Sequence, residues 1–166
     1  MTKLTDHEKQ ILLKIAREAI KSRLEGRTVP DLSLKDLPET LREEGACFVT
    51  LTRGGQLRGC VGTLQAEKPL ALDVQLRAVA AAFHYFRFPR LKIEEFPEIE
   101  IEISYLTQPE PLEFRDGEDL LARLEPGKDG LVLSDGNRKA TFLPQVWEKL
   151  PEPAQFLSHL CIKMGL

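Results

Sequence analysis

The chain has 166 residues, a net charge of -3, and 42% hydrophobic and 30% charged residues. These values are typical of one globular domain, or one domain with a small lobe. The polar amino-terminal residues lack the apolar region of a secretory signal, and no apolar run approaches the ~20 residues that span a bilayer. Three widely spaced cysteines without a CxxC pair disfavour disulfides and structural zinc, and they predict a cytoplasmic protein. We expect no metal and no cofactor.

Charge is distributed unevenly along the chain. Residues 1–28 are mildly basic, whereas residues 93–119 carry ten acidic side chains and one basic side chain. Such an acidic segment would repel phosphate groups, and the sequence shows no basic strands studded with aromatic residues. We therefore expect two solvated faces and no nucleic-acid partner.

The first half of the chain predicts two helices and a β-hairpin. Thr5 and Glu8 form a capping box before an apolar stripe of helical period, and Gly26 is a suitable end for this helix. Gly54-Gly55 is a strong signal for a two-residue hairpin turn. The elements expected after the first helix are a short helix over 37–43 and two strands over 46–53 and 56–63.

The second half predicts further helices around a strand and a second hairpin. Pro69 suits the first turn of a helix over 70–85. Residues 98–106 alternate between apolar and polar, as in a half-buried strand with one solvated face. The remaining expected elements are a helix over 116–124, a hairpin over 130–142 and a helix over 153–164. This order predicts an α+β fold with a mostly antiparallel or mixed sheet flanked by helices.

The strand over 56–63 contains the residue that we select for chemistry, Cys60. Because side chains alternate along a strand, Leu57 and Val61 are expected on one face and Arg58 and Cys60 on the other. If the first pair enters the core, the thiol faces a groove beside a guanidinium group. A nearby cation favours the thiolate and lowers a thiol pKa.

Glycines flank this cysteine on both sides. Gly59 and Gly62 mark either a bulge or the close approach of a ligand, a helix or other backbone. The alternative for Cys60 itself is a small hydrophobic core residue, since free cysteines are often buried. Cys47 and Cys161 lie among apolar residues and are predicted to belong to the core.

The segment FVTLTRGGQLRGCVGTLQ, which includes Cys60, closely resembles the signature of the AMMECR family, whose hallmark is LRGCIG. Val61 replaces the isoleucine of that hallmark. The resemblance covers roughly residues 12–166, and further segments match in the same order: 87–89, 99–106, 129–131, 142–147 and 156–166. Departures are Tyr85-Phe86 in place of Asp-Pro, Arg90 in place of proline, and Met164 in place of alanine. Any role of that aspartate is lost here.

The resemblance implies an α+β fold with a larger and a smaller lobe, and a single AMMECR-like domain over residues 1–166. Family members, also called AmmeMemoRadiSam system protein A, are associated in prokaryotes with Memo-like and radical-SAM proteins. This association implies a modification pathway, with those proteins or a small molecule as partners, and leaves the molecular function of the family unestablished.

Two functions remain open, and a third is disfavoured. The first is an enzyme, or a component of an enzyme system, that uses Cys60 with help from Arg58 and His159. The second is a binding module for a small anionic ligand or a protein, in which backbone N–H groups form the site. The third, nucleic-acid binding, is disfavoured by the net charge. The residues predicted to bind a ligand are Gly59, Gly62, Thr63, Arg87 and Trp147.

Overall fold

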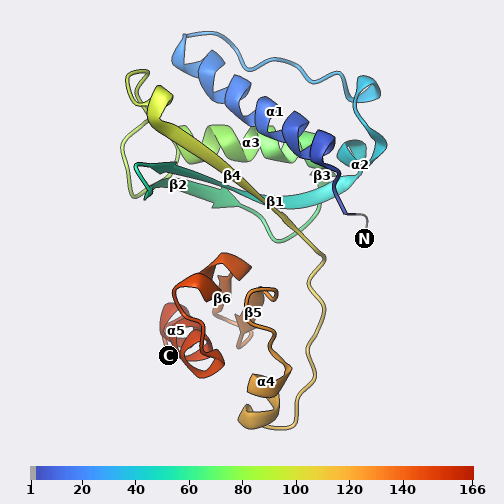
Figure 1. The fold of residues 1–166 in the computed structure, drawn as a ribbon, viewed down its shortest axis with the longest axis vertical. Coiled ribbons are helices and arrows are strands. Elements are labelled where there is room, and N and C mark those ends of the chain that lie inside the picture. The colour runs from blue at the N-terminus through green and yellow to red at the C-terminus, as the bar shows by residue number, and fades with distance from the viewer. Residues whose placement is uncertain (1–2) are drawn as a thin grey trace. The chain divides into compact units, whose positions relative to one another are not determined.

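A computed structural model describes residues 3–166 and divides the chain into two compact units. The first unit ends at Gln108, and the second runs over Pro109–Leu166 (Figure 1). Buried hydrophobic side chains form one cluster in the first unit and two smaller clusters in the second. The division confirms the expected α+β fold with a larger and a smaller lobe.

The first unit is one antiparallel sheet with two long helices on one of its faces (Figure 1). β1 is central, because it pairs with β2 and β4 along most of its length and with β3 at its first two residues. The elements are α1 (Asp6–Leu24), α2 (Glu39–Arg42), β1 (Glu44–Arg53), β2 (Gln56–Gly62), β3 (Lys68–Pro69), α3 (Leu70–Phe83) and β4 (Ile99–Leu106). Short 3-10 turns lie at Leu34–Asp36 and Phe96–Glu98.

Local sequence explains where these elements begin and turn. The Thr5 hydroxyl accepts a hydrogen bond from the Glu8 backbone N–H at 3.1 Å, and the Thr5 N–H donates to the Glu8 carboxylate at 3.0 Å. This is the predicted capping box. Gly54 and Gly55 have φ values of 57° and 79°. Both are left-handed, so the β1–β2 turn has the twist that suits a two-residue hairpin.

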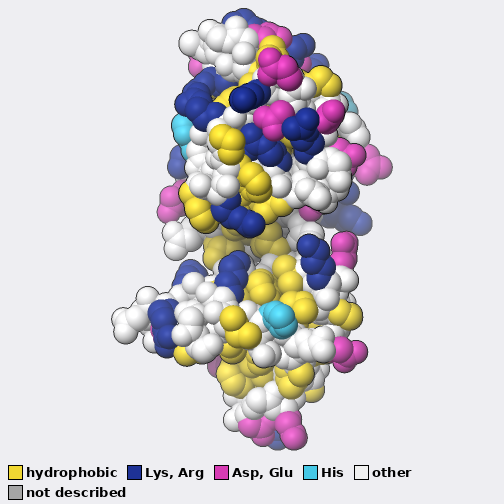
Figure 2. Space-filling model, turned by 90° about the vertical axis from the view of Figure 1, so that its left-hand side faces the viewer, with side chains coloured by type: hydrophobic (Ala, Val, Ile, Leu, Met, Phe, Trp, Pro, Cys, Tyr) yellow, Lys and Arg dark blue, Asp and Glu magenta, His cyan; other side chains and the backbone are white. Residues whose placement is uncertain are grey.

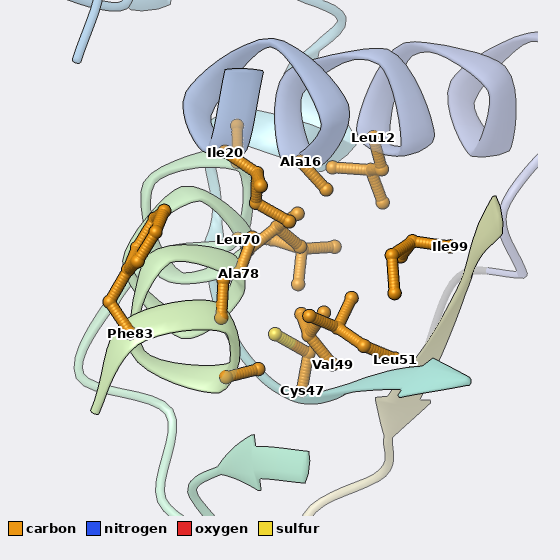
Figure 3. Close-up of a cluster of buried hydrophobic side chains, with 14 of the residues drawn as sticks. Leu12, Ala16, Ile20, Cys47, Val49, Leu51, Leu70, Ala78, Phe83 and Ile99 are labelled. Atoms are coloured by element: carbon orange, nitrogen blue, oxygen red, sulfur yellow. The ribbon is translucent and has the colours of Figure 1, made fainter. Parts of the chain in front are cut away.

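The core of the first unit fills the space between the sheet and the two helices. Figure 3 shows Leu12, Ala16 and Ile20 of α1 pointing toward Val49 and Leu51 of β1. Side chains of α3 complete the cluster from the same side of the sheet. One face of the sheet is therefore buried by helices of this unit, and we call it the covered face; the opposite face, which these helices do not cover, is called the open face.

The second unit packs three helical segments around a hairpin. Its elements are α4 (Gly117–Arg123), β5 (Leu131–Ser134), β6 (Lys139–Phe142), a 3-10 helix (Pro144–Glu148) and α5 (Pro153–Met164). The rings of Trp147 and Phe156 stack at a centroid distance of 3.7 Å. The Trp147 indole N–H also donates to the Asp129 carbonyl at 2.7 Å. This residue therefore anchors the smaller core.

Several details differ from the sequence prediction. The short strand β3 and the 3-10 helices were not expected, since each is too brief to show a period. Cys161 is half-buried, so its assignment to the core is wrong. Within α3, Val74, Ala78 and Ala82 face the core, whereas Leu76 is 43% exposed.

The surface carries mixed charge. In the view of Figure 2, Lys and Arg side chains of the first unit are interspersed with Asp and Glu, and hydrophobic side chains gather on the visible face of the second unit. Exposed apolar residues of the second unit include Phe114, Ile162 and Leu166. Among residues 3–166, no helix is long and apolar enough to cross a bilayer.

Candidate functional site

A β-bulge in β2 places the side chains of the candidate site. Gly59 pairs with Leu51 of β1, but the next pair along joins Leu57 to Thr52, so Arg58 is the extra residue. Residues that pair across an antiparallel ladder share a face. Leu57 therefore lies on the face of Thr52, which is the open face. The predicted alternation, with Leu57 opposite to Cys60, is wrong because the bulge adds one residue.

The bulge also gives Arg58 a partner of its own. Its guanidinium donates to the Glu95 carboxylate at 2.9 and 3.1 Å and to the Pro89 carbonyl at 2.9 Å. The side chain is only 10% exposed and lies over the Phe88 ring. The expectation that Arg58 and Cys60 share a groove is therefore wrong, since the segment after α3 binds this guanidinium.

Glu95 completes a bidentate ion pair at the end of the sheet. The hydrogen bonds from Arg58 hold the pKa of the Glu95 carboxyl below its ordinary value, and the Lys92 backbone N–H and the charge of Arg53 act in the same direction. A bidentate arginine–carboxylate pair is geometrically specific. It fixes the segment that follows α3 against β2.

The two glycines that flank Cys60 each have a packing reason. A Cβ at Gly59 would lie 2.1 Å from the carbonyl oxygen of Ala81 in α3. A Cβ at Gly62 would lie 2.3 Å from the Phe48 ring and 2.4 Å from the Cys47 carbonyl oxygen. Gly59 thus lets a helix approach the covered face, and Gly62 lets an aromatic ring lie across the strand.

Cys60 lies on the open face, half-buried, in a row of polar residues. It pairs with Thr50, and Thr50 pairs on its other side with Glu102 of β4. The Cys60 sulfur lies 3.4 Å from the Thr50 hydroxyl oxygen, a distance at which either group can donate. Since Gly59 and Val61 face the helices, the prediction that the thiol leaves the core of this unit holds.

Cys47 shows the opposite environment on the covered face. It is 0% exposed, and its thiol donates to the Asp73 carboxylate at 3.2 Å. Burial raises the pKa of this thiol far above its usual range, and the negative charge of Asp73 adds to the effect. Arg77 pairs with the other carboxylate oxygen of Asp73 at 3.1 Å. Cys47 therefore belongs to the core, as the sequence predicted. A buried thiol with a raised pKa is expected to react slowly.

The other predicted site residues fall in different places. Thr63 follows β2, and its hydroxyl accepts from the Gln65 N–H at 3.2 Å. Arg87 is exposed and lies over the Phe88 ring. His159 is exposed on α5 of the second unit, where Trp147 is buried as described above. Within the first unit, the structure brings together Cys60 and Thr50, with Gly59, Gly62 and Thr63 adjoining along the chain.

Sequence reasoning missed Thr50 and Glu95. Thr50 gave no local signal, because its role follows from the register of two strands. Glu95 lies 37 positions beyond Arg58. The sequence showed that the segment around Glu95 is acidic, but it did not show that Arg58 is the partner of this carboxylate. Both omissions concern pairing between segments that are distant in the chain.

Comparison with known proteins gives consistent results. A family model described as AMMECR1 matches residues 13–166. A protein of Methanothermobacter thermautotrophicus is 40% identical over 98% of this chain and 85% of its own length. The protein MJ0810 of Methanocaldococcus jannaschii is 32% identical over 100% of this chain and 83% of its own.

A solved structure has the same fold. The crystal structure of the uncharacterized protein PH0010 from Pyrococcus horikoshii superposes with a TM-score of 0.90 at 32% sequence identity. The match covers 99% of this chain and 83% of that chain. The names of these relatives state no reaction and no ligand.

Proposed function

The chain belongs to the AMMECR1 family, whose molecular function is unestablished, and we propose that it acts as an enzyme-system component through the thiol of Cys60. The observation that carries this proposal is the position of the thiol. It is half-buried on the open face of a helix-backed sheet, with the Thr50 hydroxyl at 3.4 Å. Cytoplasmic location, where thiols stay reduced, is part of the same proposal.

Rigidity of the strand supports a catalytic role over incidental exposure. The residue before Cys60 lies against the backbone of α3, and Gly62 lies under the Phe48 ring. The bulge beside them is held by the pair of Arg58 and Glu95. A reacting group on a rigid element keeps its geometry without an entropic cost at each turnover.

The chemistry would be nucleophilic. The Cys60 sulfur would form a bond to an electrophilic carbon of the substrate, the bond from that carbon to its leaving group would break, and the thiol proton would leave with that group. The Thr50 hydroxyl can donate to the developing thiolate, which favours the charged form. Substrates could be small electrophiles, or groups carried by Memo-like or radical-SAM proteins.

The alternative function, a binding module built on glycine N–H groups, has weaker support from the geometry. Gly59 is buried against Ala81, so its missing side chain serves helix packing. Gly62 is half-buried and accommodates Phe48. Both glycines thus have a packing explanation that needs no ligand.

The test is cysteine reactivity in the native protein. We would treat the full chain with iodoacetamide between pH 6 and pH 9 and follow each cysteine by peptide mass spectrometry. We expect Cys60 to react at least tenfold faster than Cys161, which is also half-buried, while Cys47 stays unmodified. A model acyl thioester should then acylate Cys60, with release of its thiol.

Two variants complete the design. Cys60→Ser should remove acylation while leaving the unfolding curve unchanged, and Cys161→Ser should leave acylation intact. Equal rates at Cys60 and Cys161, with no acyl transfer, would exclude nucleophilic catalysis by this thiol.

A further inference from the structure

The outer edge of β4 leaves backbone groups available for another strand. β4 pairs with β1 over its whole length and, within residues 3–166, with no second strand (Figure 1). Arg17 donates to the Ile99 carbonyl at 3.0 Å from the side away from β1. Backbone groups alternate in direction along a strand. The N–H and C=O groups of Ile101, Ile103 and Tyr105 therefore also point outward.

The register of the sheet leads independently to the same assignment. The Thr63 N–H donates to the Cys47 carbonyl, so the backbone groups of Cys47 point toward β2. By alternation, those of Thr50 point toward β4 and pair with Glu102. Ile103, the next residue in β4, must then point its backbone groups away from the sheet.

An apolar groove runs along this same edge. It has a volume of about 610 Å³ and lies between the amino-terminal half of α1 and β4. Leu12 and Leu13 line it from the helix, and Ile101, Ile103 and Tyr105 line it from the strand. Side chains from both faces of β4 border the groove, because Glu102 of the open face also lines it. The groove therefore follows the strand edge itself.

Charge on the two sides of the edge differs. Glu100 and Glu102 are exposed on the open face. Lys3 and Lys9 line the groove on the helix side, where Lys9 lies 4.0 Å from the Asp6 carboxylate. A strand added at this edge would present alternate side chains to two environments, one apolar and bordered by lysines, the other acidic.

We propose that the β4 edge binds an extended segment of a partner protein in which apolar residues alternate with Lys or Arg. The partner's backbone pairs with Ile101, Ile103 and Tyr105, its apolar side chains enter the groove, and its basic side chains lie beside Glu100 and Glu102. Backbone hydrogen bonds supply affinity and alternate side chains supply specificity in such strand addition. This surface is separate from Cys60 and does not depend on a catalytic thiol.

A second copy of the chain fits this edge less well. Antiparallel pairing of two β4 strands with nearly complete overlap brings Glu100 and Glu102 of the two copies opposite or diagonally next to one another. Like charges at such positions destabilise a ladder. Basic side chains at these positions would instead be attracted to Glu100 and Glu102. Charge complementarity therefore favours a different protein with basic residues over a second copy of the chain.

The experiment uses the full chain and three capped seven-residue peptides. In the first, valine alternates with lysine; in the second, valine alternates with glutamate; the third is the lysine peptide with every second amide N-methylated. Binding is followed by amide NMR shifts and by hydrogen exchange. We expect the lysine peptide to bind and to slow exchange at Ile101, Ile103 and Tyr105. The glutamate peptide should bind more weakly than the lysine peptide by a factor of about five or more. The N-methylated peptide should not bind.

Charge reversal supplies the matched variants. Glu100→Lys with Glu102→Lys should invert the preference between the lysine and glutamate peptides. Glu18→Lys with Glu39→Lys changes the net charge equally at exposed positions of the same unit, and should leave the preference unchanged. The proposal is overturned by binding without protection of β4 amides, by equal binding of both peptides, by equal effects of the two double variants, or by no saturable binding. Concentration-dependent dimerisation that protects the same amides would assign the edge to a second copy and overturn it as well.

Discussion

The two faces of the β1–β2–β4 sheet place the same residue type in opposite environments. On the covered face, Cys47 is fully buried and its thiol donates to Asp73. On the open face, Cys60 is half-buried beside the Thr50 hydroxyl. Alternation along the strands places successive side chains on two opposite faces of the sheet. The helices then decide which of these faces becomes part of the core. The difference teaches that a cysteine's chemistry follows from what packs against its face of the sheet.

The largest expected effect concerns the contact that makes one face covered. Gly59→Ala should lower the free energy of unfolding by about 3 kcal/mol, because its Cβ would overlap the Ala81 carbonyl and force α3 from the sheet. Gly117→Ala is the control, since a Cβ there meets nothing within 4 Å. Urea denaturation measures both variants. A loss below about 1 kcal/mol for Gly59→Ala would show that α3 is not held this closely.

The next prediction compares how much the side chains of the two cysteines contribute to the free energy of unfolding. Cys47→Ala should cost about 2 kcal/mol, because it removes buried volume and one hydrogen-bond donor to Asp73. Cys60→Ala should cost less than about 1 kcal/mol, since its side chain is only half-buried. Thermal unfolding of the two single variants makes the comparison. Equal losses would mean that the open face is packed as tightly as the covered one.

A smaller effect concerns the pair that holds the bulge. Glu95→Gln should lower the free energy of unfolding by about 1 kcal/mol at pH 7, because Arg58 loses its charged partner. The folded pKa of Glu95 lies below its ordinary value of 4.5, so this contribution is present above that value. It is lost as the pH falls through the folded pKa.

The pH dependence supplies the check on that pair. The free energies of unfolding of the wild-type protein and of Glu95→Gln, measured between pH 7 and pH 2, should therefore become equal at the acid end. A gap that stays constant down to pH 2 would contradict a role for the carboxylate charge.

The smallest expected effect lies on the open face. Thr50→Val keeps the shape of the side chain and removes the hydroxyl that lies 3.4 Å from the Cys60 sulfur. Loss of a donor to the thiolate should slow alkylation of Cys60 at pH 7 by about two- to fivefold. The alkylation rate of Cys60, followed by peptide mass spectrometry, tests this prediction. Thr52→Val, on the same face and strand, is the control. Faster alkylation in Thr50→Val would indicate that the hydroxyl accepts from the thiol instead.

The sequence by itself determined the order and type of the main elements. Period and end signals located α1, the β1–β2 hairpin, α3, β4 and α5, because a capping box, a Gly-Gly turn and apolar repeats are local features. It also led to the hypothesis that Cys60 is the functional residue, through the flanking glycines and the family resemblance. Cys47 was placed correctly in the core from its apolar neighbours.

Only the tertiary structure decided which groups surround Cys60. The bulge at Arg58 broke the alternation on which the predicted thiol–guanidinium pair rested, and a bulge depends on the register between two strands. Glu95 and Thr50 meet their partners across 37 and 10 positions of the chain, so no local pattern could reveal them. Local physics fixes what each segment becomes, whereas the neighbours of a side chain depend on how distant segments pack.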